Sequence, residues 1–408
     1  MKVISRRSAL RAGVAIVSII AVTPVLAQKK YGPGVTDTEI KIGNIMPYSS
    51  PASAYAVIGK ADAAYFEMIN DQGGINGRKI NFISYDDAYS PPKTVEQARK
   101  LVESDEVLLI FQPLGTAGNS AIQKYLNAKK VPQLFVASGA TKWGDPKNFP
   151  WTMGFQPNYQ SEGRIFAKYI LDHHKDGKIA GLYQNDDFGK DILKGLRDGL
   201  GASASMIISE ATYETSEPTA DSQVVKLRSS GADIFVDIAA PKFAAQSIKK
   251  LAEMNWKPVH FLSSVAGSIG SVLRPAGLDN SKGVLSTAYT KEATDPAWRD
   301  DPKMKKWHAF MDKYLPKADR EDNGYISGAM AAQTLVEVLT RCGDDLTREN
   351  VMRQAAGLKD YEVDVLLPGI KLNTSPTDFY PIEQMQMRRF NGQAWELFGP
   401  VITGEVGS

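Results

Sequence analysis

From residue 38 onwards, the chain alternates short apolar runs with longer segments whose apolar residues recur every three or four positions. The short runs predict β-strands and the periodic segments predict amphipathic α-helices. Strands are expected at 39–46, 79–86, 107–113, 132–138, 178–186, 205–213, 232–240, 259–265 and 283–290. Helices are expected at 56–71, 92–104, 117–130, 159–174, 188–200, 221–230, 242–254, 302–315, 323–342 and 347–357. This alternation indicates an α/β fold.

The predicted strands are apolar without strict alternation, as in parallel sheets whose two faces are both covered by helices. The pattern occurs once up to residue 138 and again from residue 178, on either side of an extended connector at 151–158. We therefore expect two doubly wound parallel-sheet lobes. A hairpin at 385–399 follows, with Asn391-Gly392 as its turn.

Three glycines, Gly73, Gly74 and Gly77, stand between the predicted helix at 56–71 and the strand at 79–86. Phosphate-binding glycines lie where a strand leads into a helix, so that helix N–H groups meet the anion. Here the order is reversed. We therefore expect these glycines to end the helix in left-handed conformations rather than to bind a nucleotide.

The first 27 residues have the features of a secretory signal peptide. A basic start precedes an apolar run from Ala12 to about Val22, and Val25-Leu26-Ala27 forms a small-residue cleavage pattern. The run is too short to span a membrane, and "SRRSALR" also fits twin-arginine export. No later stretch approaches the roughly 18 apolar residues of a membrane span. We expect cleavage after Ala27 and a soluble protein in the periplasm.

Loss of this segment would change the net charge of the chain. It removes four of the 48 basic side chains and none of the 46 acidic ones, which leaves a net charge of about −2. Nucleic-acid-binding proteins usually carry a strong basic excess, so we expect no nucleic-acid partner. The single cysteine, Cys342, cannot form a disulfide within the chain.

Catalytic motifs are missing from the sequence, which has no G-x-S-x-G elbow, no H-E-x-x-H and no P-loop. The carboxylate pairs Asp86-Asp87 and Asp186-Asp187 end predicted strands, where they are expected to cap helices and accept hydrogen bonds from loop N–H groups. We therefore expect no enzyme activity, no cofactor and no metal.

The loops after the predicted strands are where a ligand would bind, because open parallel sheets bind ligands beyond the carboxyl ends of their strands. These loops are rich in hydroxyl groups, small residues and helix starts. They lie at 47–55, 113–120, 137–141, 185–191, 239–243 and 263–268. Their Ser and Thr residues could serve only as helix N-caps. Because the loops come from both lobes, we expect them to form two halves of one cleft.

Several motifs of the sequence resemble those of a known family. "GGINGRKI", followed by "YDD" and "EQARKLVE", resembles the opening lobe of periplasmic leucine/isoleucine/valine-binding proteins, and "YQNDDFGKDILKGLRDGL" resembles their second-lobe motif. The similarity runs over 38–400. It implies a type I periplasmic binding protein, in which three crossover strands join two lobes that close on a ligand.

The resemblance also implies the organisation and the partners of the protein. The first lobe would comprise 38–154 with 288–380, and the second 155–287 with 381–408. The protein would be a monomer that delivers a small-molecule ligand to the membrane permease of an ABC importer.

Site residues follow from the same resemblance. It places the ligand carboxylate at the hydroxyl group of Thr116 and at the loop 138–140, where Thr141 could supply the family's threonine after a one-residue shift. It places aromatic walls at Tyr55 and Phe188. With their loop neighbours, the expected ligand-binding residues are Tyr48, Ser49, Tyr55, Leu114, Gly115, Thr116, Ser138, Gly139, Ala140, Thr141, Phe188, Ala240, Pro241, Ser264 and Val265.

One departure from the family bears on the ligand. The amino-acid binders place an acidic residue in the loop 263–268 to pair with the ligand ammonium, whereas this chain has Val265. A buried ammonium without a counter-charge costs several kcal/mol. The crossover loop offers Glu162, which is expected to face along the next helix. The sequence therefore favours an amphipathic carboxylate, either an aromatic or a short aliphatic acid.

Three alternatives remain open at this stage. The ligand could be a branched-chain amino acid held by Glu162 or by a backbone carbonyl. The protein could be a sensor that presents its ligand to a membrane receptor. It could also be a secreted hydrolase, which the missing catalytic motifs oppose.

Overall fold

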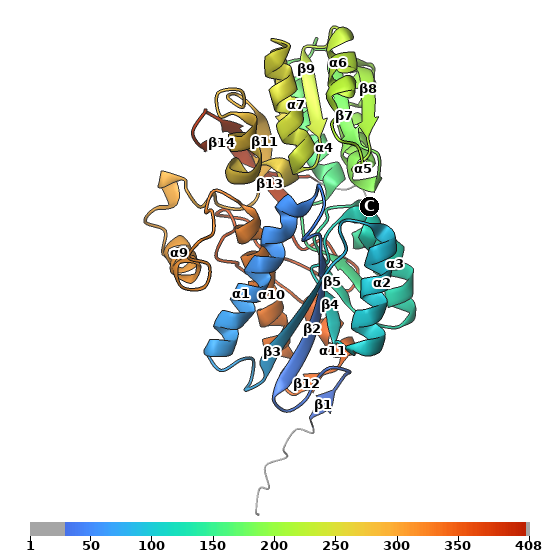
Figure 1. Cartoon of the computed structure of the whole chain (residues 1–408), viewed down its shortest axis with the longest axis vertical. Coiled ribbons are helices and arrows are strands. Elements are labelled where there is room, and N and C mark those ends of the chain that lie inside the picture. The colour runs from blue at the N-terminus through green and yellow to red at the C-terminus, as the bar shows by residue number, and fades with distance from the viewer. Residues whose placement is uncertain (1–28, 405–408) are drawn as a thin grey trace, which may run out of the picture.

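The computed structural model describes residues 29–404, which form two lobes stacked along the long axis of the molecule (Figure 1). One sheet has five strands and the other has seven. Each sheet is packed against helices (Figure 1). The predicted two-lobe α/β fold is confirmed. The expected signal peptide, residues 1–27, lies outside the described residues.

The first-lobe sheet is parallel throughout, with the strand order β3-β2-β4-β5-β6. Its strands are β2 (Glu39–Met46), β3 (Lys79–Asp86), β4 (Leu109–Phe111), β5 (Gln133–Val136) and β6 (Thr152–Gly154). Two apolar clusters cover its two faces. The helices on one face are α1 (Ala56–Asp71) and α10 (Gly324–Cys342), and those on the other are α2 (Pro91–Arg99) and α3 (Thr116–Ala128).

The outer part of this lobe carries smaller elements. They are α9 (Pro302–Tyr314), α11 (Arg348–Ala355) and a two-stranded parallel sheet of β1 (Lys30–Tyr31) and β12 (Asp345–Leu346). Arg78, with a side chain only 2% exposed, joins the small sheet to the lobe through a 2.7 Å ion pair with Asp344 and a 2.7 Å hydrogen bond to the Tyr31 hydroxyl.

The predicted elements all occur, but several are shorter than expected. The strands predicted at 107–113, 132–138, 259–265 and 283–290 are shorter at one or both ends, and the helix predicted at 92–104 is α-helical only to Arg99. Helix α1 and strands β2 and β3 match their predicted residues. Strand β4 is shorter than the predicted 107–113 because Gln112 has a left-handed φ of 46°, which ends the extended run. The extended run therefore ends before the loop that leads into α3.

The glycine turn after α1 ends the helix as predicted. Gly73 and Gly74 have φ values of 106° and 78°, and the N–H of Gly74 donates to the Ile69 carbonyl at 2.9 Å. A Cβ at Gly74 would collide with the carbonyl of Arg78. Only glycine satisfies both the left-handed conformation and this close approach.

The second-lobe sheet has the strand order β14-β13-β11-β10-β9-β7-β8. Its parallel strands are β7 (Ile179–Gln184), β8 (Ile207–Tyr213), β9 (Ile234–Ile238), β10 (Val259–Leu262) and β11 (Leu285–Ala288). The helices on one face are α4 (Tyr159–His173) and α5 (Asp187–Leu200), and those on the other are α6 (Asp221–Ser229) and α7 (Pro241–Glu253). A short helix, α8 (Arg274–Ala276), packs beside α7.

An antiparallel hairpin, β13 (Gln384–Phe390) and β14 (Trp395–Thr403), extends the second-lobe sheet at one edge. The hairpin confirms the prediction, but its connection has four residues, because Phe390 pairs with Trp395. The side chain of Asn391 accepts hydrogen bonds from the N–H groups of Gln393 and Ala394, and this bonding closes the longer turn.

The chain crosses between the lobes three times, as expected. It leaves the first-lobe sheet after Gly154, returns after Ala288, and enters the second lobe again before Gln384. The predicted connector at 151–158 contributes the edge strand β6 before it crosses. The lobe boundaries at single-residue detail stay a prediction.

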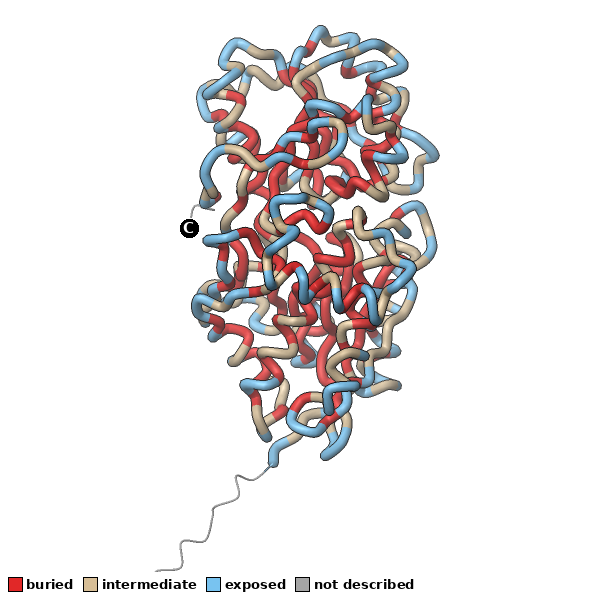
Figure 2. The backbone as a smooth tube through the Cα atoms, turned by 90° about the vertical axis from the view of Figure 1, so that its left-hand side faces the viewer, coloured by how far each residue is buried: buried red, intermediate tan, exposed pale blue. Residues whose placement is uncertain are grey.

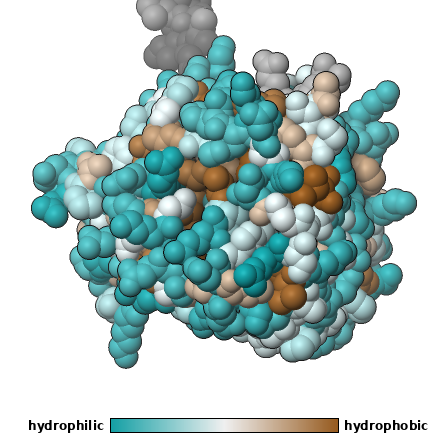
Figure 3. Space-filling model, turned by 90° about the horizontal axis from the view of Figure 1, so that it is seen from above, coloured by the Kyte–Doolittle hydropathy of each residue, from teal (hydrophilic) through white to brown (hydrophobic). Residues whose placement is uncertain are grey.

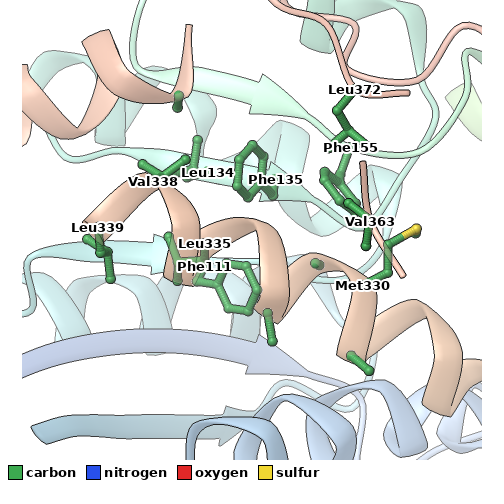
Figure 4. Packing of buried hydrophobic residues seen from close by; sticks show 14 of the residues in the cluster. Phe111, Leu134, Phe135, Phe155, Met330, Leu335, Val338, Leu339, Val363 and Leu372 are labelled. Atoms are coloured by element: carbon green, nitrogen blue, oxygen red, sulfur yellow. The ribbon is translucent and has the colours of Figure 1, made fainter. Parts of the chain in front are cut away.

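The buried residues follow the sheets of both lobes (Figure 2). In the first lobe, Leu335 and Val338 of α10 pack against Phe111 and Leu134 of the sheet (Figure 4). The outer end of the second lobe is mostly hydrophilic, and its hydrophobic side chains gather in small separate patches (Figure 3). Within residues 29–404, no helix is both long enough and apolar enough to span a bilayer.

Candidate ligand-binding site

A cavity of about 80 Å³ lies where the carboxyl ends of the two sheets face each other. That volume is several times the ~10–15 Å³ that a single water needs. Residues of both lobes and of the crossovers line the cavity, in agreement with the prediction that strand-end loops of the two lobes form one cleft. Nine of the predicted residues line it: Tyr55, Leu114, Gly115, Thr116, Phe188, Ala240, Pro241, Ser264 and Val265.

The other predicted residues do not line the cavity. They are Tyr48, Ser49, Ser138, Gly139, Ala140 and Thr141. Tyr48 and Ser49 bind the neighbouring strand instead: the Tyr48 hydroxyl lies 2.6 Å from Ser84 Oγ, and the Ser49 N–H donates to Asp86 at 3.1 Å. These hydrogen bonds hold the loop at 47–55 against β3, so neither residue lines the cavity and their contact with a ligand stays a prediction.

The loop 138–141 lies behind the cavity. A Cβ at Gly139 would collide with the carbonyl of Pro157. The N–H of Thr141 donates to Asp191 at 2.7 Å, and its hydroxyl to Asn158 at 3.2 Å. Thr141 therefore faces the second lobe, and the one-residue shift that would bring it to a ligand does not occur.

Ser138 acts on the cavity through Thr116. Its oxygen accepts hydrogen bonds from the indole N–H of Trp143 at 3.0 Å and from the N–H of Ala140 at 3.3 Å. It also lies 2.7 Å from the Thr116 hydroxyl. Either hydroxyl of this pair can donate to the other. Ser138 therefore holds the Thr116 hydroxyl in place on the cavity wall.

Helix α3 begins at Thr116, on the cavity wall. Gly115 precedes it with φ 98° and provides no side-chain cap. A Cβ there would lie 2.7 Å from the ring of Tyr89. The open N-terminus of a 13-residue helix presents N–H groups and the positive end of its dipole, which favours an anion.

Tyr89, which sequence reasoning missed, enters the cavity from a strained loop. Ala88 and Tyr89 have left-handed φ values of 49° and 57°. Asp86 and Asp87 hold this conformation by accepting from the N–H groups of Ala88 at 2.9 Å and Tyr89 at 2.8 Å. The predicted loop-binding role of this carboxylate pair is confirmed. Strain of this kind persists where the surrounding structure enforces it, often at binding sites.

In the second lobe, Asp186 caps α5 and thereby positions Phe188. Its carboxylate accepts from the N–H of Phe188 at 3.0 Å and of Gly189 at 3.3 Å. This confirms the capping role predicted for Asp186. The Phe188 ring packs edge-on against Tyr159, with centroids 5.0 Å apart.

The main residue that sequence reasoning missed is Arg388 on β13, which lines the cavity and is only 5% exposed. Its guanidinium lies over the ring of Trp395 at 4.1 Å and 3.5 Å from the carboxylate of Glu292. Its Nη2 lies against Gly267, where a Cβ would collide with it. Within residues 29–404, Arg388 Nε has no hydrogen-bond partner.

The pair of Arg388 and Glu292 is deeply buried, and its pKa values reflect this. Burial lowers the pKa of the Arg388 guanidinium, which stays charged at neutral pH because its ordinary pKa exceeds 12. Burial raises the pKa of Glu292 to about 7, although the nearby guanidinium acts to lower it.

Two further buried acids lie close to this wall. Glu162 accepts hydrogen bonds from the N–H of Ser264 at 2.7 Å and from the hydroxyl of Thr287 at 2.8 Å. It therefore faces the second-lobe strands, and the prediction that it faces along its own helix was wrong. Asp322 lines the cavity, and it accepts from Ser268 at 3.2 Å and from the N–H of Gly324 at 3.1 Å. Burial raises the pKa of both acids.

Contacts between the lobes flank the cavity on both sides. Lys142 pairs with Asp187 at 2.8 Å on one side. On the other, the N–H of Gly270 donates to the carbonyl of Glu321 at 3.0 Å, and Arg274 pairs with the Glu321 carboxylate. The two lobes are therefore in direct contact beside the cavity. Among the described residues, no group of His, Cys, Asp and Glu side chains could hold a metal ion.

Comparison with known proteins agrees with this fold and cavity. A family model described as "Periplasmic binding protein" matches residues 39–394. The chain belongs to the periplasmic binding protein family. It is 23% identical over 339 residues to the Leu/Ile/Val-binding protein homolog 7 of Brucella abortus (strain 2308), which covers 78% of this chain and 80% of that protein.

Two solved structures share the fold. One is a branched-chain amino acid ABC transporter protein from Thermus thermophilus with bound valine, with a TM-score of 0.80, 17% identity, and coverage of 90% of this chain and 97% of that chain. The other is a fatty acid ABC transporter substrate-binding protein from Thermomonospora curvata, with a TM-score of 0.74, 21% identity, and coverage of 92% and 95%.

The resemblance seen in the sequence motifs is thereby confirmed. The chain is a periplasmic binding protein, and the family implies a small-molecule ligand.

Proposed function

We propose that this protein captures a small amphipathic carboxylate, an aromatic or short aliphatic acid, and presents it to the permease of an ABC importer. The observation that carries this proposal is Arg388, a buried cation in the cavity wall with an unpaired Nε. A buried donor without an acceptor is costly, and a ligand carboxylate would supply the acceptor.

The position of Arg388 argues against a zwitterion. The amino-acid binders that the sequence resembles place their ammonium-binding acid in the loop 263–268, at the position of Val265. In this protein, the guanidinium of Arg388 lies against Gly267 of that loop. A ligand ammonium in this place would lie beside that positive charge.

The opposite wall suits the rest of such a ligand. Tyr55, Tyr89 and Phe188 provide aromatic surface, and the α3 N-terminus with the Thr116 hydroxyl provides a second set of donors. Pockets with apolar walls and a few fixed polar groups are typical of small-molecule sites.

One observation favours a second candidate, a branched-chain amino acid. Asp322 lines the cavity and could accept a hydrogen bond from an ammonium. Its Oδ1 already accepts from Ser268 and Gly324, however, and burial raises its pKa, which disfavours the charge that an ammonium needs. We therefore place the acid first.

Calorimetry on the mature protein distinguishes the two candidates. Benzoate, hexanoate and leucine are titrated separately, and leucine is expected to bind at least tenfold more weakly than the better acid, a difference of about 1.4 kcal/mol. Micromolar or tighter binding of leucine, with no response to either acid, would contradict the proposal. A thermal-shift assay is a second readout, since ligand at 100 times its Kd adds about 2.7 kcal/mol of stability.

We further propose export by the N-terminal signal peptide, with cleavage after Ala27. The basic start and the small-residue pattern at Val25 and Ala27 support this proposal. Mass spectrometry of periplasmic protein is expected to show Gln28 as the first residue. A retained Met1 in that fraction would contradict it.

A further inference from the structure

The ion pair of Arg388 and Glu292 is placed asymmetrically at the cavity. Arg388 lines the cavity, while Glu292 lies behind it and reaches the guanidinium through Oε2 at 3.5 Å. Their side chains are 6% and 7% exposed. Glu292 Oε1, like Arg388 Nε, has no hydrogen-bond partner among the described residues. The pair is buried, long and incompletely bonded.

Other charges around the pair add mainly negative potential. Glu292 faces Asp295 in its own segment and Asp322 before α10. Arg388 faces Glu162 from α4 and the Tyr289 hydroxyl from the crossover after β11. The guanidinium is the one cation among these groups.

We propose that binding of a carboxylate to Arg388 is coupled to the uptake of one proton by Glu292. The ligand then takes over as the ionic partner of the guanidinium, and Glu292 becomes a neutral carboxylic acid. This inference rests on the proposed function, because it requires an anionic ligand at Arg388.

Charge conservation in a buried site is the physical reason. Before binding, the pair consists of one guanidinium and one carboxylate. After binding with proton uptake, it consists of one guanidinium, one ligand carboxylate and one neutral carboxyl group, so the net charge of the cluster is unchanged. Without the proton, two carboxylates would share one buried cation, and like charges at such a distance strongly raise one pKa. The proton comes from solvent.

The pH dependence follows from the pKa of Glu292, which is raised to about 7 before ligand binds. A ligand carboxylate beside Glu292 raises that pKa further. Below about pH 6, Glu292 is already protonated in the free protein, so ligand binding takes up only a small fraction of a proton. Above pH 7 it is ionised in the free protein, so uptake approaches one proton and affinity falls. The Kd is expected to be about tenfold higher at pH 8 than at pH 6.

Calorimetry in buffers with different ionisation enthalpies measures this proton directly. Benzoate, hexanoate and leucine are titrated into the mature protein at about pH 7.5 in phosphate and in Tris. Between about half a proton and one proton should be taken up per bound acid. The Glu292→Gln variant should bind acid without proton uptake and with a flat pH profile. Asp295→Asn, a control that removes a neighbouring acid, should keep the uptake.

A second measurement covers the case in which Glu292→Gln fails to fold. Infrared difference spectra of the unmodified protein should show a new protonated-carboxyl band when acid is added at pH 7.5. The absence of that band would overturn the inference.

The outcomes separate this inference from the proposed function. Acid binding with no proton exchange overturns the coupling and leaves the proposed ligand class in place. Binding of leucine alone overturns the proposed ligand class. It also overturns the coupling, unless leucine binding takes up a proton and Glu292→Gln abolishes that uptake. No binding of any of the three compounds overturns both.

Discussion

The two walls of the cavity recognise a ligand in different ways. The first-lobe wall consists of local features: the N-terminus of α3, the hydroxyl of Thr116 and a left-handed Gly115, all within a few residues of one strand end. The second-lobe wall depends on Arg388 of β13, which is backed by Glu292 in the segment after β11, 96 positions away in the chain. One wall uses neutral donors and a helix dipole, and the other uses buried charge.

This difference shows where the specificity of the fold can change. Helix dipoles and hydroxyl groups are common to many anion sites, so the first wall suits any carboxylate. In the function that we propose, the second wall selects what accompanies the carboxylate, because a guanidinium there would repel an ammonium.

The largest effect is expected from removing the charged wall. Replacing both partners, Arg388→Met with Glu292→Gln, avoids leaving a buried unpaired carboxylate and should weaken acid binding by about 2–5 kcal/mol. Calorimetry with benzoate and hexanoate measures the loss. Arg389→Met is the matched control, since the adjacent Arg389 is exposed and does not line the cavity. Equal effects of the two variants would remove Arg388 from the site.

A smaller effect is expected at the first wall. Thr116→Val keeps the shape of the side chain but loses the hydroxyl, and should weaken acid binding by about 1–2 kcal/mol, the contribution of a hydrogen bond to a charged group. Ser120→Ala in the next turn, whose hydroxyl bonds the Thr116 carbonyl at 2.8 Å, should change affinity by less than about 0.5 kcal/mol. If Thr116→Val weakens acid binding more than the double variant does, the carboxylate binds to the first wall and the order of the two walls is reversed.

The smallest effect is expected where the two walls are held together. Asp187→Asn removes the ion pair with Lys142, whose partners are 54% and 36% exposed. Such exposed pairs contribute about 0–1 kcal/mol, and salt screens them. The loss of affinity should be below about 1 kcal/mol at low salt and should vanish near 1 M NaCl. Asp172→Asn, which breaks an exposed pair within α4, should have no effect on affinity. A larger, salt-independent loss for Asp187→Asn would mean that this carboxylate does more than close the cleft.

Sequence reasoning placed the first wall better than the second because the information is local there. The glycine, the hydroxyl residue and the helix start follow one another in the chain, and a parallel sheet brings such loops to one edge. It failed at Tyr48, Ser49 and the loop 138–141, whose positions depend on contacts with β3, the crossover and α5. No local pattern shows whether a loop hydroxyl points into a cavity or behind it.

The sequence by itself determined the alternation of strands and helices, the two lobes and the helix-ending glycines, because apolar periodicity and turn chemistry act over a few residues. The family followed from the resemblance of its motifs to those of known proteins. Only the tertiary structure decided the charge of the cavity. Alternation along β13 puts Arg388 and Arg389 on opposite faces, and only packing against Trp395 and Glu292 selects Arg388 as the buried one. The same folding turned Glu162 towards Ser264 and brought Asp322 to the cavity from a distant segment. A buried ion pair is a contact between residues far apart in the chain, so no property of either residue alone reveals it.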